Sequence, residues 1–292
     1  MKGTVLGVAG VGLIGGSIAL RAHAAGASVV GYDRDPGALR AAVAAGALDA
    51  TAPDLATLAE RCNVVAIALP VDVTIDVLAT TPQLDRAELV FDVASVKLPI
   101  VEAARERAHF VASHPLAGRE TGGFGAADPA LFEGCTWAVT PARDAAAQAR
   151  LEAFVTALGA RPLAIGAEEH DRLVAVSSHL PQLLSVALGA HLAATGDADG
   201  RVYELCGPGM RSMLRLAHSD AALWAPIAQA NAGAVAEALQ AVAAALQATA
   251  NGLGAGRLDA LLAAFEGAHR AVGALEHSAG STGSLPHPGP KR

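Results

Sequence analysis

Aromatic residues, positive charge and cysteine are all scarce in this sequence. Phe, Trp and Tyr make up only 3% of the 292 residues, and 28 Asp and Glu outnumber 21 Lys and Arg, which gives a net charge of -7. A chain without a basic stripe or stacking rings is poorly suited to bind nucleic acid. The cysteines, Cys62, Cys135 and Cys206, are far apart and have no C-x-x-C spacing. We therefore expect reduced thiols in a cytoplasmic protein, with neither disulfides nor a metal site.

Long hydrophobic runs are also missing, although 52% of the residues are hydrophobic and the mean hydropathy is +0.38. Much of that hydropathy comes from alanine, and no stretch of ~18 residues is strongly apolar and free of both charge and glycine. The apolar beginning has only Lys2 before it and no small-residue cleavage site after it, unlike a signal peptide. These features predict no membrane contact and enough apolar material for two globular domains.

A strand, a glycine-rich turn and a helix are expected at the beginning of the chain. The turn contains three spaced glycines, Gly10, Gly12 and Gly15. The first permits a tight turn, the second lets backbone approach a pyrophosphate, and the third lets the helix pack closely on its strand. The backbone N–H groups of Leu13 and Ile14 would face the phosphates. This order predicts a dinucleotide site, although glycine turns with a purely structural role also exist.

An acidic residue at the expected distance strengthens the dinucleotide prediction. A second apolar run, at residues 28–32, ends at Asp33, close to the ~20-residue offset of the acid that binds the ribose hydroxyls of NAD. Its carboxylate would repel a 2′-phosphate, which favours NAD. Arg34 adjoins it and would also admit NADP.

Apolar runs that alternate with helical segments organise the first half of the chain. Strands are expected at residues 64–69, 89–93, 110–113 and from residue 136, followed by a helix at 145–158 and a last strand before Gly166. Alternating strands and helices predict an α/β fold with a Rossmann-type doubly wound parallel sheet.

From residue 166 onwards the pattern changes to long helices rich in Ala and Leu. We therefore place a dinucleotide-binding domain at residues 1–165 and an all-helical substrate and dimerisation domain at residues 166–276. A helix expected over residues 221–250 would carry more apolar surface than a small bundle buries, which favours a homodimer through this domain. Residues 277–292, rich in Gly, Ser and Pro, are expected to be disordered.

Polar residues follow two of the predicted strands, at the edge where a doubly wound sheet binds its ligands. Ser95 and Lys97 come after one strand, and His114 comes after the next. A histidine can accept a proton near neutral pH while a hydride leaves, which makes His114 a candidate base. The alternative is a loop histidine bonded to backbone. The glycine-rich segment 118–127 has the length of an active-site loop.

The helical region carries two further candidate groups. Ser178, His179 and Gln182 lie around a proline in an otherwise apolar helix, where a lone histidine is more typical of a hydrogen-bonded core residue than of a catalyst. Arg211 and Arg215 are spaced i, i+4 and would share one helical face. Their guanidinium groups would suit the carboxylate of an anionic substrate, and a solvated charged face is the alternative.

Six segments, in order over about residues 4–250, form a specific set. They are Val8-Ala9-Gly10-Val11-Gly12-Leu13-Ile14-Gly15-Gly16-Ser17, Asp92-Val93-Ala94-Ser95-Val96-Lys97, Ser113-His114-Pro115-Leu116-Ala117-Gly118, Leu131-Phe132-Glu133-Gly134, Ser178-His179-Leu180-Pro181, and Arg215-Leu216-Ala217 with Ser219-Asp220 and Trp224. Together they resemble the prephenate/arogenate dehydrogenase family of tyrosine biosynthesis.

The resemblance implies an enzyme that performs NAD-dependent oxidative decarboxylation of prephenate or arogenate. A hydride would pass from the carbinol carbon to the nicotinamide, the hydroxyl proton would pass to a base, and CO2 would leave as the ring becomes aromatic. By the same resemblance, His114 is the base and Ser95 lies near the hydroxyl and the nicotinamide. Arg215 would bind a substrate carboxylate, with Arg211 as the second candidate.

The resemblance also implies that Ser178 and His179 line or support the substrate pocket and that Trp224 packs near it. Many members read Ser-His-Leu-Pro-His, whereas this chain has Gln182 in the last place. A neutral amide there replaces a group that can carry charge beside the substrate side chain. The choice between the keto acid prephenate and the amino acid arogenate therefore stays open.

Two other functions remain as alternatives. A 3-hydroxyacid dehydrogenase of similar layout would use a lysine from the helical domain, but the only lysines are Lys2, Lys97 and Lys291. A non-catalytic dinucleotide-sensing protein would need the glycines and Asp33 but neither His114 nor Arg215. The presence of both residues favours an enzyme.

Overall fold

The computed structural model describes residues 1–119 and 121–281. The chain divides into two compact units, residues 1–232 and the residues that follow Ala232. The first unit contains the sheet expected for the dinucleotide-binding domain together with the first part of the helical region. The domain boundary between residues 165 and 166 stays a prediction.

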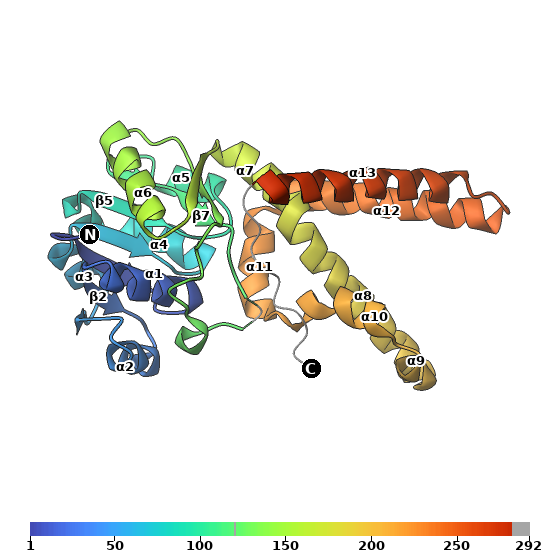
Figure 1. The fold of residues 1–292 in the computed structure, drawn as a ribbon, viewed down its shortest axis with the longest axis horizontal. Coiled ribbons are helices and arrows are strands. Elements are labelled where there is room, and N and C mark those ends of the chain that lie inside the picture. Colours follow the sequence, from blue (N-terminus) through green and yellow to red (C-terminus); the bar gives the residue numbers. More distant parts are fainter. Residues whose placement is uncertain (120, 282–292) are drawn as a thin grey trace. The chain divides into compact units, whose positions relative to one another are not determined.

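Six parallel strands form the main sheet, in the order β3-β2-β1-β4-β5-β6. They are β1 (Val5–Ala9), β2 (Ser28–Tyr32), β3 (Ala50–Thr51), β4 (Val64–Ile67), β5 (Leu89–Asp92) and β6 (Phe110–Val111). The chain runs outwards from β1 through β2 to β3 and then crosses back to β4 on the other side of β1 (Figure 1). This order confirms the predicted Rossmann-type fold and creates the switch point at which such sheets bind ligands.

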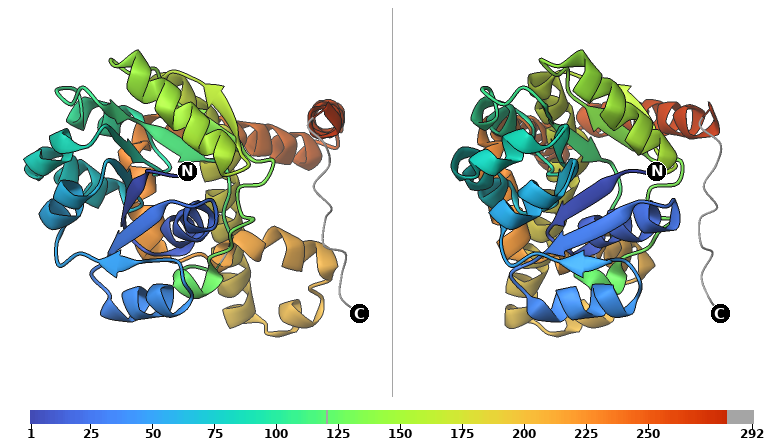
Figure 2. Two further views of the ribbon diagram at one scale, coloured as in Figure 1. Left: turned by 60° about the vertical axis from the view of Figure 1, so that its left-hand side comes forward. Right: turned by 90° about the vertical axis from the view of Figure 1, so that its left-hand side faces the viewer.

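Helices lie on both faces of this sheet because its strands point successive side chains into two separate cores (Figure 2). One core includes Ile18 and Leu151, and the other includes Leu58, Leu78 and Ile100. The elements that surround the sheet are α1 (Leu13–Ala24), α2 (Pro36–Ala44), α3 (Leu55–Arg61), α4 (Val71–Thr80), η1 (Pro82–Arg86), α5 (Leu98–Ala103) and α6 (Ala145–Ala157).

The apolar run at residues 110–113 does not form one strand as predicted. The chain leaves β6 and enters a second sheet of order β7-β8-β9, made of β7 (Ser113–Pro115), β8 (Thr136–Val139) and β9 (Arg161–Ala164). Ser113 donates hydrogen bonds from N and Oγ to Asp92 at the end of β5, and these bonds replace the ladder there. His114 consequently lies within β7, opposite Ala138 of the antiparallel β8, and not in a loop after a strand.

Helices make up the rest of the first unit. They are α7 (Ala167–Val174), η3 (Ala175–His179), α8 (Leu180–Ala198), α9 (Arg201–Glu204), α10 (Pro208–Met213), η4 (Arg215–His218) and α11 (Ala221–Ala230), and a short turn, η2 (Phe124–Ala126), lies in the segment after β7. In the described parts of the chain, one helix, Ala167–Ala198, is long and apolar enough to cross a membrane by length and composition. The core helix of a soluble domain passes the same test, and this helix buries the polar side chains of His179, Gln182 and Ser185.

The single helix predicted over residues 221–250 is interrupted at Asn231. α11 ends at Ala230, and α12 (Ala232–Gly254) begins after a residue with φ -118° and ψ 29°. Pro226 lies inside α11, and the Asn231 side chain donates to the backbone oxygen of Asp171 at 2.8 Å. A buried asparagine bound to another helix therefore ends the helical ladder, a long-range contact that periodicity does not reveal.

The second unit contains α12 and α13 (Asp259–Ser281), which are joined by a turn with Gly256 at φ +69°. The disorder predicted for residues 277–292 is wrong for residues 277–281, because α13 continues through them. Its last turn is supported by a contact of 2.6 Å between His277 Nδ1 and the oxygen of Gly273. Residues 282–292 lie outside the described residues.

Candidate active site

The glycine turn after β1 has the shape expected of a dinucleotide site. A side chain at Gly10, where φ is +92°, would place Cβ 2.3 Å from the oxygen of Ala68, and one at Gly15 would place Cβ 1.9 Å from the oxygen of Gly10. Gly12 differs, because its Cβ would meet no atom within 4 Å. The first and third glycines are thus required by packing, and the second leaves open space beside the backbone.

The beginning of α1 faces that open space without a side-chain cap. Gly12 is its N-cap residue and makes no capping bond, so the N–H groups of Leu13 and Ile14 have no partner within the helix. Asp33 follows β2, and its carboxylate accepts from Val11 N at 2.7 Å and from Asp35 N at 2.9 Å. These bonds hold the acid against the turn, where it can reach a ribose. The residues present therefore fit a dinucleotide.

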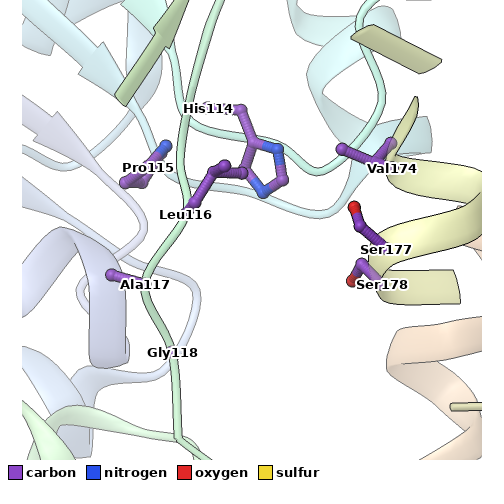
Figure 3. A pocket seen from close by; sticks show the side chains of 8 residues that line it. All are labelled: His114, Pro115, Leu116, Ala117, Gly118, Val174, Ser177 and Ser178. Carbon is purple, nitrogen blue, oxygen red and sulfur yellow. The ribbon is translucent and has the colours of Figure 1, made fainter. Parts of the chain in front are cut away.

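His114 lines a cavity of about 400 Å³. The half-buried imidazole projects from β7 towards the polar turn η3, which follows α7, and Figure 3 shows Ser177 and Ser178 on the far side of the space. The lining residues are His114, Pro115, Leu116, Ala117, Gly118, Val174, Ser177 and Ser178. Segments on the two sides of the predicted domain boundary thus form one cavity within the first unit.

Hydrogen-bond contacts lead from His114 through two further residues into the protein interior. His114 Nδ1 lies 3.0 Å from His170 Nε2, and His170 Nδ1 lies 2.7 Å from Asp171 Oδ1. Both His170 and Asp171 are buried. The Asp171 carboxylate also accepts backbone hydrogen bonds from Lys97 at 2.7 Å and Leu98 at 2.8 Å. Asp171 therefore joins α7 to the segment that carries Ser95.

A buried ion pair fixes the other side of that segment. Lys97 and Asp92 are both 0% exposed, and Lys97 Nζ contacts the Asp92 carboxylate and donates to the oxygen of Ser113 at 2.7 Å. Burial raises the pKa of Asp92 and lowers the pKa of Lys97, and the attraction between the two charges opposes both shifts. The pair ties the loop of the half-buried Ser95 to the residue before His114.

Burial and neighbouring positive charge keep His114 neutral. Its pKa lies well below the ordinary value of 6.5, chiefly because of burial and then because of Lys97, His170 and His179. A neutral imidazole can accept a proton, which is what a base in the cavity requires. Burial likewise lowers the pKa of His179 to about 4, partly opposed by Asp171.

The Ser178-to-Gln182 segment begins in the π-helical turn η3 and continues into α8. Pro181 cannot donate a hydrogen bond to the carbonyl one turn earlier, and its ring crowds that carbonyl, so the helix widens there. Ser178 faces the cavity, whereas His179 is buried with its ring edge against Trp224 at a centroid distance of 5.9 Å. Nδ1 of His179 lies 3.3 Å from Asn231 Nδ2, and Nε2 is a buried atom without a hydrogen-bond partner.

Gln182 does not face the cavity. Its Nε2 donates to the oxygen of Leu216 at 2.8 Å, and Ser185 Oγ donates to the oxygen of Met213 at 2.8 Å. These two bonds hold the end of α10 and the turn η4, which begins at Arg215, against α8. Gln182 therefore positions the segment that carries the candidate carboxylate-binding residue.

The expectation that Arg211 and Arg215 share one helical face is wrong. α10 contains Arg211 and ends at Met213, and Arg215 begins the separate 3-10 turn η4. Both arginines are exposed, and neither lines the cavity. The i, i+4 rule does not apply across a change of helix type.

The sequence interpretation did not identify His170, Asp171 or Asn231. The first two lie in the polar run Glu168-Glu169-His170-Asp171, directly after the predicted domain boundary, and that position is the only local signal they carry. Asn231 has a weaker signal as a lone amide between two apolar helices.

A Rossmann-type sheet, an open glycine turn and a cavity with a neutral histidine define a dinucleotide-binding protein with an adjoining substrate site. Comparisons with known proteins specify it further. The family model "Prephenate dehydrogenase, nucleotide-binding domain" matches residues 17–163, and "Prephenate dehydrogenase, dimerization domain" matches residues 166–267. The chain belongs to the prephenate dehydrogenase family, as its motifs indicated.

Individual relatives agree with this assignment. The prephenate dehydrogenase of Bacillus subtilis is 31% identical over 237 residues, which cover 78% of this chain and 64% of that protein. The chain thus spans just under two thirds of the length of this curated relative. The crystal structure of Synechocystis arogenate dehydrogenase is similar with a TM-score of 0.76 and 28% identity, over 92% of this chain and 99% of that one.

A second solved structure supports the fold alone. Prephenate dehydrogenase from A. aeolicus, in complex with hydroxyphenyl propionate and NAD+, has a TM-score of 0.85 at 23% identity and covers 94% of this chain and 99% of that one.

Gly12→Ala should leave the fold intact and weaken NAD binding by about tenfold or more, because the new methyl group fills space beside the pyrophosphate. Titration calorimetry measures the affinity, and thermal unfolding checks the fold. Gly200→Ala is the matched control, since that position also faces open space but lies outside the turn. Unchanged NAD affinity in Gly12→Ala would contradict this assignment of the turn.

Proposed function

We propose that the protein catalyses NAD-dependent oxidative decarboxylation of prephenate, arogenate or both, in tyrosine biosynthesis. The observation that carries the proposal is the neutral His114 on a cavity beside an open glycine turn, in a chain of this family. The names of the relatives, a prephenate dehydrogenase and an arogenate dehydrogenase, supply the two substrates.

The proposed reaction needs one hydride acceptor and one base. NAD, when bound, accepts the hydride from the carbinol carbon of the ring. His114 takes the hydroxyl proton, and the electrons of the bond to the departing CO2 make the ring aromatic. The proton returns to the phenolate oxygen, so that the substrate and NAD+ give the phenol, CO2 and NADH with no net proton released.

The other site residues support binding of the substrate. Ser95 lies in a loop that Lys97 and Asp171 fix near His114, which suits a contact with the hydroxyl. Arg215 is proposed to bind a carboxylate, with Arg211 as the weaker candidate. Ser178 lines the cavity, while His179 and Trp224 pack together behind it.

Cofactor choice rests on Asp33, whose carboxylate is bonded to the turn at Val11 and suits free ribose hydroxyls. Arg34 is exposed next to it and would tolerate a 2′-phosphate. The 3-hydroxyacid alternative is disfavoured, because Lys97 is buried and its Nζ is bonded to Asp92 and Ser113. We propose NAD as the preferred cofactor.

The cysteines support a cytoplasmic location as part of the proposal. All three are free, and burial raises the pKa of Cys62 and of Cys135 to about 11, so both thiols are protonated and unreactive near neutral pH.

A homodimer through the helical region is the expected assembly. The second unit exposes large apolar side chains on both helices, including Leu246 at 62%, Phe265 at 56% and Leu275 at 70% exposure. Such surface normally marks an interface. Light scattering after gel filtration at micromolar concentration should give twice the mass of 29.2 kDa. A monomeric mass would contradict the assembly.

The purified protein should reduce NAD faster than NADP when prephenate or arogenate is supplied. His114→Asn should bind NAD normally and lose turnover by about 100-fold or more, because a positioned base contributes 10²–10⁴-fold.

The pKa of His114 lies well below the ordinary histidine value of 6.5. We therefore expect kcat/KM to stay constant as the pH falls from 7.5 and to decline only below pH 6.5. Initial rates over pH measure both effects.

Arg215→Gln should raise KM more than Arg211→Gln, which serves as its matched control.

Absence of NAD reduction with both substrates, in protein shown to bind NAD, would overturn the proposed reaction and favour a dinucleotide sensor. Full turnover by His114→Asn would overturn the role of His114 alone.

A further inference from the structure

We propose that His170 and Asp171 are positioning residues that set the tautomer of His114, so that its Nε2 is unprotonated and available to the substrate hydroxyl. This inference rests on the proposed function only in naming the group that His114 deprotonates. The tautomer itself follows from the direction of a chain of hydrogen bonds.

The series of hydrogen bonds begins at Asp171, whose side chain only accepts them. Asp171 Oδ1 receives the backbone N–H of Lys97 at 2.7 Å, and Oδ2 receives that of Leu98 at 2.8 Å. Backbone N–H groups can only donate, which identifies both oxygens as acceptors and the group as a carboxylate. The contact of 2.7 Å from His170 Nδ1 to Oδ1 must therefore be donated by the histidine.

The position of the proton on His170 then sets the direction of the next hydrogen bond. A neutral imidazole with its proton on Nδ1 has a lone pair on Nε2. That Nε2 lies 3.0 Å from His114 Nδ1, and two lone pairs cannot bond, so a neutral His170 requires the proton on His114 Nδ1. A neutral His114 protonated on Nδ1 has its lone pair on Nε2.

The remaining nitrogen, Nε2, is part of the His114 ring, which lines the cavity opposite Ser177 and Ser178 (Figure 3). When Nε2 accepts a proton, His114 becomes a cation that already donates towards His170, with the Asp171 carboxylate beyond it. Other groups that act on His114 are Lys97, after β5, and His179, in η3. Both disfavour a positive charge, as does a charged His170, so the negative charge that supports the protonated ring is the Asp171 carboxylate beyond His170.

The test compares His170→Leu with His170→Gln. Leucine removes both hydrogen bonds, whereas the amide oxygen of glutamine can still accept from His114 Nδ1. We expect His170→Leu to lower kcat by about tenfold or more with little change in NAD affinity, and His170→Gln to recover most of the loss. His191→Leu is the matched control, because His191 is exposed on α8.

A second measurement does not depend on turnover. The ¹⁵N shifts of the His114 ring in NAD-free protein report which nitrogen carries the proton. We expect a protonated Nδ1 in the wild type and in His170→Gln, and a mixture of tautomers in His170→Leu. A protonated Nε2 in the wild type would overturn the inference. So would full turnover by His170→Leu in a wild-type-active enzyme, whereas an inactive wild type with the expected shifts would overturn only the proposed reaction.

Discussion

The rest of the site depends on the hydrogen bonds that the Asp171 carboxylate accepts. Asp171 accepts the backbone N–H groups of Lys97 and Leu98 and the ring N–H of His170, and its backbone oxygen accepts from Asn231. One buried residue, through its side chain and its backbone oxygen, thereby joins the loop after β5, helix α7 and the residue that follows α11. Removing one partner from such a buried charged network costs about 3–5 kcal/mol, because the groups left behind remain buried and unpaired.

The fold was predictable where the signal was local. The glycines of the first turn and the apolar strands each follow from neighbouring residues. The errors arose where a distant contact decides the backbone. Asp92 draws Ser113 out of the run at residues 110–113, and Asp171 holds Asn231 where a continuous helix was expected.

The same distinction separates the predicted site residues from those that were missed. His114 and Ser178 line one cavity. Both could be predicted as site residues, because polar residues beside an apolar strand and in an apolar helix are visible in the sequence. Gln182 was predicted beside the substrate, and that role stays a prediction; its bond to the backbone of Leu216 could not be predicted, because the partner lies 34 residues away. His170 was not identified at all, because its role depends on a pairing across 56 residues with His114.

Amide hydrogen exchange at Lys97 and Leu98 tests the central role of Asp171 most directly. Both N–H groups lie at the beginning of α5, where the intrahelical ladder supplies no partner, so their protection must come from the carboxylate. In Asp171→Ala we expect exchange at these two amides faster by about tenfold or more, with the amides of β1 unchanged. Equal exchange at Lys97 and Leu98 in both proteins would contradict it.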